Sequence, residues 1–289
     1  MKEIKLSSGK KVLASDPFTP KDFFLNTFVG RQNEMRMITA AWLNSGNTPP
    51  LCPLLVGEPG VGKNRLVYEV AREMRLPLYP MQGHEDLTCD DLACGVRFSD
   101  KRSSAMEYVL SPLVTAMHEG GICFIDEIGK ARPRALALLV SVLDERRYID
   151  STLLGERVYA QPGFRFIAAT NTGEVNGLPE FIRSRMRPLV ELGFPPKEEI
   201  EELAGRVLEL NGQTPDLLKE FWRLWTTANR KPTPRDTIHH FALASRLAQQ
   251  PVIKAGNNGH GPMVGRSANS ITPDSLRESF EQLFQKNLK

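Results

Sequence analysis

Between residues 54 and 192, five short apolar runs alternate with stretches of helical periodicity. The runs span residues 54–56, 78–81, 122–125, 164–168 and 189–192. Strands of a parallel sheet are buried on both faces, so they appear as continuous apolar segments, and each needs a crossover helix to reach the next. The sequence therefore predicts an α/β fold, with a five-stranded parallel sheet covered by helices on both faces.

The pattern changes on either side of this region. The first residues mix charges with prolines and show no sustained period, whereas amphipathic helical patterns follow Pro195 and Pro196 without strands between them. We expect an N-terminal arm with little structure of its own at residues 1–28, an α/β domain at 29–194, a small helical lid at 195–250, and a flexible loop with a C-terminal helix at 251–289. The last helix is expected to begin at Thr272, because a proline follows it.

Charge and hydropathy exclude several classes of protein. The 289 residues carry 37 Lys and Arg against 34 Asp and Glu, so a strongly basic nucleic-acid-binding tail and an acidic tail are both absent. No apolar run approaches the roughly 18 residues that a membrane span requires, and the first residues lack the apolar core of a secretion signal. We therefore expect a cytoplasmic protein without membrane contact. Its four cysteines contain no C-x-x-C pair and are expected to be reduced thiols.

The clearest chemical motif lies between the first apolar run and the helical pattern after it. Residues 57–64 read GEPGVGKN, which fits the phosphate-binding pattern G-x-x-x-x-G-K but ends in Asn where Ser or Thr is usual. Glycines let backbone N–H groups curl around phosphate oxygens, and the lysine bridges the outer phosphates. We therefore expect a nucleotide site rather than an ordinary glycine-rich turn. Its expected residues are Gly57, Glu58, Pro59, Gly60, Val61, Gly62, Lys63, Asn64 and Arg65.

Polar side chains follow two further apolar runs. Asp126 and Glu127 end the third run, and Asn171 follows the fourth. Ligands of open α/β sheets bind at the carboxyl ends of the strands. We therefore expect Asp126 to hold Mg²⁺, Glu127 to polarise an attacking water, and Asn171 to orient that water or contact the terminal phosphate. Without a phosphate loop in the same sheet, these residues would be typical of a solvated strand end and a turn.

Taken in order, the segments GEPGVGK, CFIDE and FIAATN resemble the Walker A, Walker B and sensor 1 motifs of an AAA+ ATPase. The segments GHEDLTCDDLACG and DERRYIDSTLLGERVYAQPGF are similar to the MoxR and dynein-related branch of that superfamily. The resemblance implies a P-loop NTPase fold with ATP and Mg²⁺ as cofactors. It also implies two β-hairpin inserts, with strands near residues 95–98 and 107–110 and near 146–150 and 157–161, and alternation and turn residues favour the same hairpins.

Arginines acquire roles through the same resemblance. In LPEFIRSRMRP, the arginine finger that reaches a neighbouring subunit falls on Arg185, with Arg183 as the less favoured candidate, and such a guanidinium stabilises charge on the γ-phosphate. Arg235 matches the sensor 2 position at the start of a lid helix. The segment 29–31 would border the adenine. Together with Lys63, Glu127 and Asn171, Arg185 completes the expected catalytic set.

Asn64 is the main departure from the family pattern. A Ser or Thr hydroxyl at this position ligates Mg²⁺ directly, and the carbonyl oxygen of Asn64 is a hard ligand of different shape. We expect nucleotide binding to persist and hydrolysis to be slower. A second departure is the pair Gly129 and Lys130, where the family commonly has Asn-Arg.

The leading functional hypothesis is an ATPase that assembles as a homo-oligomeric ring, a hexamer by resemblance, and remodels a protein partner. The resemblance implies a partner with a von Willebrand A domain. A nucleic-acid motor is the second hypothesis, with Lys101, Arg102, Arg132 and Arg134 as a basic cluster near a central pore. The third is a nucleotide-gated scaffold with weak or no hydrolysis, because of Asn64.

Overall fold

The five apolar runs form one parallel sheet, which confirms the predicted fold class. Its strands are β3 (Leu54–Gly57), β4 (Leu78–Gln82), β7 (Ile122–Asp126), β10 (Arg165–Thr170) and β11 (Leu189–Leu192). Their order in space is β11-β3-β10-β7-β4, and every neighbouring pair is parallel. All residues of β3 and β10 are buried, which explains why these segments are apolar without alternation.

In this computed structural model, residues 1–22, 26–43, 48–98, 106–210, 217–229, 231–249, 253–254, 263–264 and 270–285 are described. The chain divides into two compact units. The first comprises Met1–Leu25, Arg31–Pro59 and Lys63–Gly193, and the second comprises Asn26–Gly30, Gly60–Gly62 and Phe194–Lys289. Among the described helices, none is both long and apolar enough to cross a membrane.

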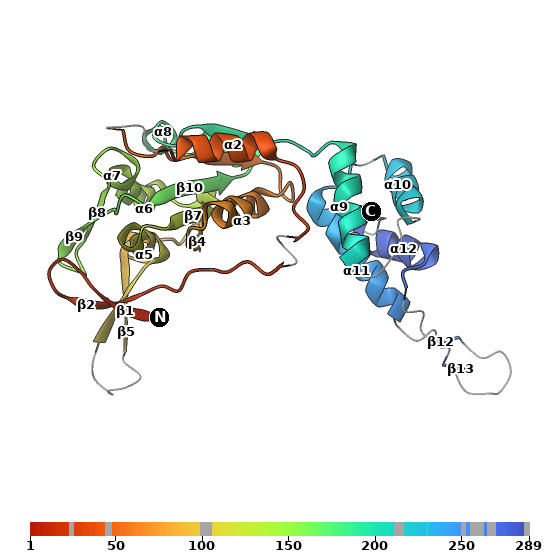
Figure 1. Cartoon of the computed structure of the whole chain (residues 1–289), viewed down its shortest axis with the longest axis horizontal. Helices are drawn as coiled ribbons and strands as arrows, with labels where there is room; N and C mark the ends of the chain where they lie inside the picture. The colour runs from red at the N-terminus through yellow and green to blue at the C-terminus, as the bar shows by residue number, and fades with distance from the viewer. Residues whose placement is uncertain are drawn as a thin grey trace. The chain divides into compact units, whose positions relative to one another are not determined.

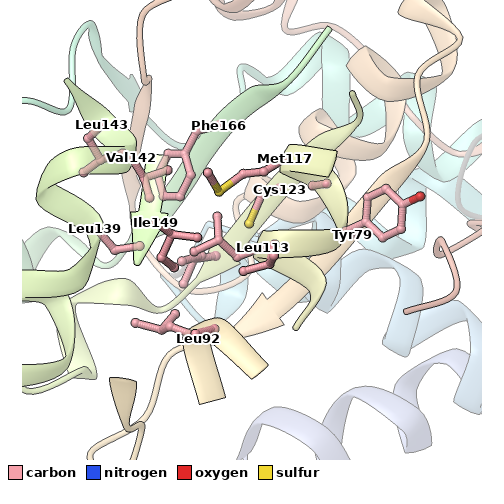
Figure 2. Close-up of a cluster of buried hydrophobic side chains, with 14 of the residues drawn as sticks. Tyr79, Leu92, Leu113, Met117, Cys123, Leu139, Val142, Leu143, Ile149 and Phe166 are labelled. Atoms are coloured by element: carbon pink, nitrogen blue, oxygen red, sulfur yellow. The ribbon is translucent and has the colours of Figure 1, made fainter. Parts of the chain in front are cut away.

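Helices pack against both faces of the parallel sheet (Figure 1). The helix α2 (Gln32–Ala41) packs against β11, α3 (Lys63–Met74) against β3 and β7, and α5 (Pro112–Glu119) against β4 and β7. Figure 2 shows Leu113 and Met117 of α5 in one apolar cluster with Cys123 of β7 and Phe166 of β10. The short helices α4 (Cys89–Ala93), α6 (Pro133–Leu136), α7 (Val140–Leu143) and α8 (Glu180–Arg183) complete the first unit.

The N-terminal segment carries more structure than its sequence predicts. It forms β1 (Lys2–Lys5) and β2 (Lys11–Ala14), which join β5 (Cys94–Phe98) and β6 (Met106–Leu110) in a four-stranded sheet of order β1-β2-β6-β5. The expectation of little structure here is therefore wrong. Strands of four residues are too short to show a period, and β2 pairs in parallel with a strand about 95 residues later in the chain.

Hairpins are present at both places where the sequence favours inserts. β5 and β6 pair antiparallel, and so do β8 (Tyr148–Ser151) and β9 (Glu156–Tyr159). The buried residues Ile149 and Val158 face the core from β8 and β9, whereas Tyr159 is exposed. The strands therefore alternate between an apolar and a polar face, as half-buried hairpins do.

The second unit is helical. It contains α9 (Lys197–Leu210), α10 (Leu217–Thr227), α11 (Pro234–Gln249) and α12 (Pro273–Phe280). Leu276 and Phe280 of α12 lie in the same buried cluster as Phe221 and Phe241, so the C-terminal helix belongs to the core of this unit. Its predicted start is confirmed by a reciprocal capping box at Thr272. Within the loop at 251–271, β12 (Ile253–Lys254) pairs with β13 (Met263–Val264), and most of that loop lies outside the described residues.

Candidate nucleotide site

Lys63 connects the predicted phosphate loop to the predicted sensor residue. Its ammonium donates hydrogen bonds to the carbonyls of Gly57 at 2.6 Å and Glu58 at 3.2 Å, and to Asn171 Oδ1 at 3.1 Å. The residue is only 8% exposed, so its charge is compensated by these oxygens. Gly57 ends β3, and Asn171 directly follows β10, which pairs with β3. The parallel sheet therefore brings two of the predicted motifs together at its carboxyl edge.

The loop backbone adopts conformations that only glycine takes easily. Gly60 and Gly62 have φ values of +87° and +104°, in the left-handed region. α3 begins at Lys63, immediately after the second of these glycines, so the loop ends at a helix N-terminus. Such a terminus offers free backbone N–H groups to an anion. Val61 between the glycines is buried.

The predicted sensor 2 residue, Arg235, contacts the tip of the loop within the second unit. Its backbone N–H donates to the carbonyl of Gly60 at 3.4 Å. A Cβ at Gly60 would lie 2.9 Å from Thr233 Oγ1, so a larger residue would collide there. Thr233 and Asp236 exchange hydrogen bonds of 3.1 Å and cap the start of α11. Arg235 thus lies in the first turn of a capped helix, beside the glycine-rich tip.

Asn64 and Asp126 are in direct contact. Asn64 Nδ2 donates to Asp126 Oδ2 at 2.7 Å, and the backbone N–H of Glu127 donates to Asp126 Oδ1 at 2.9 Å. Asn64 also shares a side-chain hydrogen bond with Tyr68, one turn further along α3. Burial and the negative charge of Asp126 raise the pKa of Tyr68. Both oxygens of the predicted metal ligand therefore already accept hydrogen bonds.

The donor set fits Mg²⁺ through Asp126. A carboxylate is the hard oxygen ligand that Mg²⁺ takes from proteins, and phosphate oxygens and waters usually supply most of the rest. Among the described residues, no three His, Cys, Asp or Glu side chains cluster as a metal site. Asn64, in contrast, presents its amide nitrogen to Asp126, so its oxygen does not face this carboxylate.

Glu127 is held by two donors that the sequence did not identify. Gln82 Nε2 donates to Glu127 Oε2 at 2.6 Å, and Lys130 Nζ donates to the same oxygen at 2.8 Å. The hydrogen bond to Glu127 raises the pKa of Lys130. Gln82 pairs with Asp126 in the β4–β7 register, so only the strand order reveals it. Glu127 itself has φ +53°, a sparsely populated conformation typical of functional sites.

Two glycines make room for this arrangement. The backbone N–H of Gly83 donates to the carbonyl of Asp126 at 2.7 Å, and a Cβ on Gly83 would lie 2.5 Å from the carbonyl oxygen of Glu127. A Cβ on Gly129 would lie 2.4 Å from Thr170 Oγ1. The departure from the family pattern at Gly129 and Lys130 therefore has a physical account. The glycine permits close packing against β10, and the lysine pairs with Glu127.

The arginine cluster makes its contacts elsewhere in the first unit. Arg185 Nη1 donates to the carbonyl of Phe181 at 2.8 Å, and its Nε lies 3.8 Å from Asp144 Oδ2. That buried Nε has no hydrogen-bond partner among the described residues. Arg146 forms the principal ion pair of Asp144, at 2.7 Å, and this hydrogen bond lowers the pKa of Asp144. The structure thus does not bring Arg185 to Lys63 or Glu127 of its own chain.

The other basic residues singled out in the sequence lie on several different elements. Arg183 pairs with Glu180 on α8. Arg65 lies half-buried on α3, where burial lowers its pKa. Arg132 and Arg134 are exposed at α6, whereas Lys101 and Arg102 lie outside the described residues. The predicted basic cluster near a pore stays a prediction, because two of its four residues lie outside the described part of the chain.

Comparisons with known proteins identify the first unit. The family described as "AAA domain (dynein-related subfamily)" matches residues 53–186. The denitrification regulatory protein NirQ of Stutzerimonas stutzeri is 31% identical over 189 residues, which cover 62% of this chain and 63% of NirQ. Protein NorQ of Paracoccus denitrificans is 35% identical over 180 residues, covering 55% of this chain and 66% of NorQ. The match thus spans less than the full length of each relative.

Solved structures agree on the fold. RuvB of Thermotoga maritima, a Holliday junction branch migration motor, has a TM-score of 0.58 at 19% identity, covering 89% of this chain and 70% of RuvB. A mutant of that protein has a TM-score of 0.62 at 20% identity, covering 91% and 74%. At this identity the likeness concerns the fold alone. The family match and the two relatives place the chain in the MoxR and dynein-related branch of the AAA+ ATPases, to which it belongs through the domain at residues 53–186.

Proposed function

We propose that this chain binds ATP with Mg²⁺ and hydrolyses it to ADP and phosphate. The observation that carries the proposal is the contact of Lys63 with Asn171 Oδ1, next to Asp126 and Glu127 on adjacent strands of one sheet. A phosphate loop, a metal-binding carboxylate and a water-activating carboxylate are the groups that nucleotide hydrolysis requires. The AAA+ family of the domain supports the same activity.

Each residue has a separate task in this proposal. When nucleotide binds, Lys63 would donate its hydrogen bonds to oxygens of the outer phosphates in place of protein carbonyls. The backbone N–H groups at the N-terminus of α3 would bind phosphate oxygens as well. Asp126 would hold Mg²⁺, which when bound neutralises charge on the phosphates. Glu127 would accept a proton from the attacking water once Gln82 or Lys130 releases its carboxylate. Asn171 would orient that water.

The proposed assembly is a homo-oligomeric ring in which Arg185 reaches the nucleotide of the neighbouring subunit. Support comes from its geometry, because Arg185 is one-third exposed, at 34%, and its Nε has no hydrogen-bond partner among the described residues. To reach a partner, this guanidinium would exchange its hydrogen bond to the Phe181 carbonyl for one to a phosphate oxygen. We further propose that the ring remodels a protein partner in the cytoplasm, with a von Willebrand A domain protein as the partner class. The division into a nucleotide-binding domain at 29–194 and a lid at 195–250 belongs to the same proposal.

Phosphate release from purified protein with ATP and Mg²⁺, measured across a range of protein concentrations, tests this function. The specific rate should rise with protein concentration, because the site needs a neighbour. Glu127→Gln should abolish turnover and keep nucleotide binding, whereas Lys63→Ala should weaken binding itself. As a matched control, Lys11→Ala removes an exposed lysine paired with Glu3 and should leave both unchanged. Turnover that persists in Glu127→Gln would contradict the assignment.

One observation favours a second candidate, a nucleotide-gated scaffold with weak or no hydrolysis. Asn64 donates to Asp126, where the family has a hydroxyl that ligates Mg²⁺. A scaffold would assemble equally with ATP and with a nonhydrolysable analogue and would release no phosphate. A nucleic-acid motor, in contrast, would bind DNA with a steep dependence on salt, and the net charge of +3 does not favour it.

A further inference from the structure

The amide of Asn64 occupies an oxygen of the carboxylate that Mg²⁺ would use. Asn64 Nδ2 lies 2.7 Å from Asp126 Oδ2, within the range of a strong charge-assisted hydrogen bond. The other oxygen, Oδ1, accepts the Glu127 backbone N–H at 2.9 Å. A metal that ligates Asp126 directly must therefore compete with hydrogen bonds that the folded chain already makes.

The orientation of this amide follows from its partner. An ionised carboxylate accepts hydrogen bonds only, so the NH₂ group of Asn64, and not its carbonyl, must face Asp126. Tyr68 shares a second side-chain hydrogen bond with Asn64, and its ring lies 5.2 Å from that of Phe18. A half-buried, packed tyrosine thus anchors the amide from the same helix. A serine or threonine hydroxyl could rotate to offer a lone pair to a metal, whereas the amide nitrogen offers none.

We propose that Asn64 is a latch on the metal site, whose amide must leave Asp126 before Mg²⁺ can bind there. The inference rests on the proposed nucleotide site and concerns its metal dependence. The closed latch, the hydrogen bond between Asn64 and Asp126, does not involve Lys63 or the loop glycines, so nucleotide binds without metal. Mg²⁺ then engages only at a higher concentration than an open Asp126 would need. Tyr68 is a positioning residue that holds the latch and does not touch the ligand.

The substitution Asn64→Ala distinguishes a latch from a metal ligand, because the two roles predict opposite changes in the Mg²⁺ requirement. If the carbonyl of Asn64 coordinated Mg²⁺, Asn64→Ala would remove a ligand and raise the Mg²⁺ requirement. If Asn64 is a latch, the same substitution frees Asp126 and lowers the requirement. Tyr68→Phe keeps the ring and removes the hydroxyl, so it should loosen the latch and lower the requirement by a smaller factor.

The experiment uses a fluorescent nonhydrolysable ATP analogue bound to the full chain in EDTA. The dissociation rate of the analogue is then measured at increasing free Mg²⁺, and the midpoint of its decrease is recorded. We expect Asn64→Ala to lower the midpoint roughly tenfold, the size of one hydrogen bond to a charged group. Tyr68→Phe should lower it by about 2- to 3-fold. Asn33→Ala, an exposed asparagine on α2, is the matched control and should leave the midpoint unchanged.

Two results would overturn the latch. One is a midpoint in Asn64→Ala equal to or above that of the parent chain. The other is an analogue that dissociates from Asn64→Ala in EDTA at least tenfold faster, since the latch does not contribute to metal-free binding. Failure of the proposed function looks different, because the parent chain would then bind no analogue with or without Mg²⁺. Circular dichroism of each variant establishes that it is folded.

Discussion

At the scale of single residues, neighbouring positions in the phosphate loop behave differently. Lys63 donates hydrogen bonds to two backbone carbonyls and to the side-chain oxygen of Asn171, next to the glycine-rich loop. Asn64, one residue later, donates through its amide nitrogen to Asp126, the carboxylate proposed to hold Mg²⁺. Glu127 is restrained by Gln82, which lies outside the motifs, and by Lys130, where the chain departs from the family pattern. The chemistry of the site therefore depends on residues outside the recognised patterns.

The substitution Gly83→Ala tests whether stability and activity require the close contact between Gly83, which directly follows β4, and Glu127, which directly follows β7. In Gly83→Ala the new Cβ would meet the backbone of Glu127 at 2.5 Å, and backbone cannot move as a side chain can. We expect the free energy of unfolding to fall by about 1–3 kcal/mol and phosphate release to fall with it. Urea unfolding and a phosphate assay measure the two effects.

Gly95→Ala is the control for this substitution. Apart from its two chain neighbours, no heavy atom of the described residues lies within 4 Å of a Cβ at Gly95, and its strand position lacks a positive φ. The unfolding free energy should stay the same or rise slightly, because alanine restricts the unfolded chain more than glycine. Equal losses in the two variants would show that close packing at Gly83 is not the cause.

At the scale of elements, the N-terminal hairpin joins the two insert hairpins of the first unit. β2 pairs with β6, and Ser15 Oγ donates to the carbonyl of Leu110 at 2.9 Å. On the other side, Lys10 Nζ donates to the carbonyl of Leu154 at 2.9 Å, and Ser7 Oγ donates to Glu156 at 3.0 Å. The turn between β1 and β2 is thus hydrogen-bonded to β9 and to the turn before it, while β2 pairs with β6.

Val12→Ala tests whether this hairpin is part of the folded core. Val12 is 2% exposed within the main apolar cluster, so its truncation should lower the free energy of unfolding by about 1–3 kcal/mol. Hydrogen exchange of the β6 amides should become faster, because β2 protects that strand. Lys11→Ala, at an exposed position in the same strand, should change stability by less than about 0.5 kcal/mol. Unchanged exchange in β6 would mean that the hairpin is only loosely attached.

At the scale of the whole molecule, the two units have separate apolar cores. The second contains a buried histidine, His240, whose Nε2 faces the carbonyl of Leu276 at 2.9 Å, while Trp225 Nε1 donates to its Nδ1 at 3.3 Å. Only a neutral ring with its proton on Nε2 satisfies both contacts. Burial lowers the pKa of His240 from 6.5 to about 4. The core of the second unit therefore contains a neutral imidazole, hydrogen-bonded on both nitrogens.

This histidine makes stability depend on pH in a defined direction. Because the folded pKa lies below the unfolded value, its contribution is complete above pH 6.5 and is lost as pH falls toward about 4. The loss should amount to about 3 kcal/mol, measured by urea unfolding between pH 7 and pH 4. In His240→Gln the unfolding free energy should be lower at pH 7, and its decrease with acid should be smaller by about the same amount. An unaltered acid dependence in that variant would assign the decrease to carboxylates.

Mixing two inactive variants tests the proposed ring. Arg185→Ala keeps Glu127, and Glu127→Gln keeps Arg185, so an interface between one of each can hold a complete site. If Arg185 acts in the neighbouring subunit, an equal mixture should recover about a quarter of the parent rate of phosphate release. An Arg183→Ala variant is the control and should be active on its own. No recovery on mixing would place the action of Arg185 within its own chain.

Local sequence patterns are sufficient to predict the parallel sheet and to locate the glycine-rich loop and the acidic pair. Each is encoded within a short window, because a buried parallel strand must be apolar and a loop that binds phosphate must have glycine at set offsets. The start of the last helix was equally local, since Thr272 caps it. Its packing was not, because the partners of Leu276 and Phe280 lie on helices earlier in the chain.

The contacts that control the site became visible only in the folded chain. Gln82 reaches Glu127 because β4 lies beside β7, and Asn64 faces Asp126 because α3 starts at the edge where β7 ends. The N-terminal strands likewise form only because β6 is there to pair with β2. Sequence windows encode what a segment prefers by itself, whereas hydrogen bonds between distant segments depend on strand order and register. Composition and motif thus determine which chemistry is present, and the tertiary structure decides which groups restrain it.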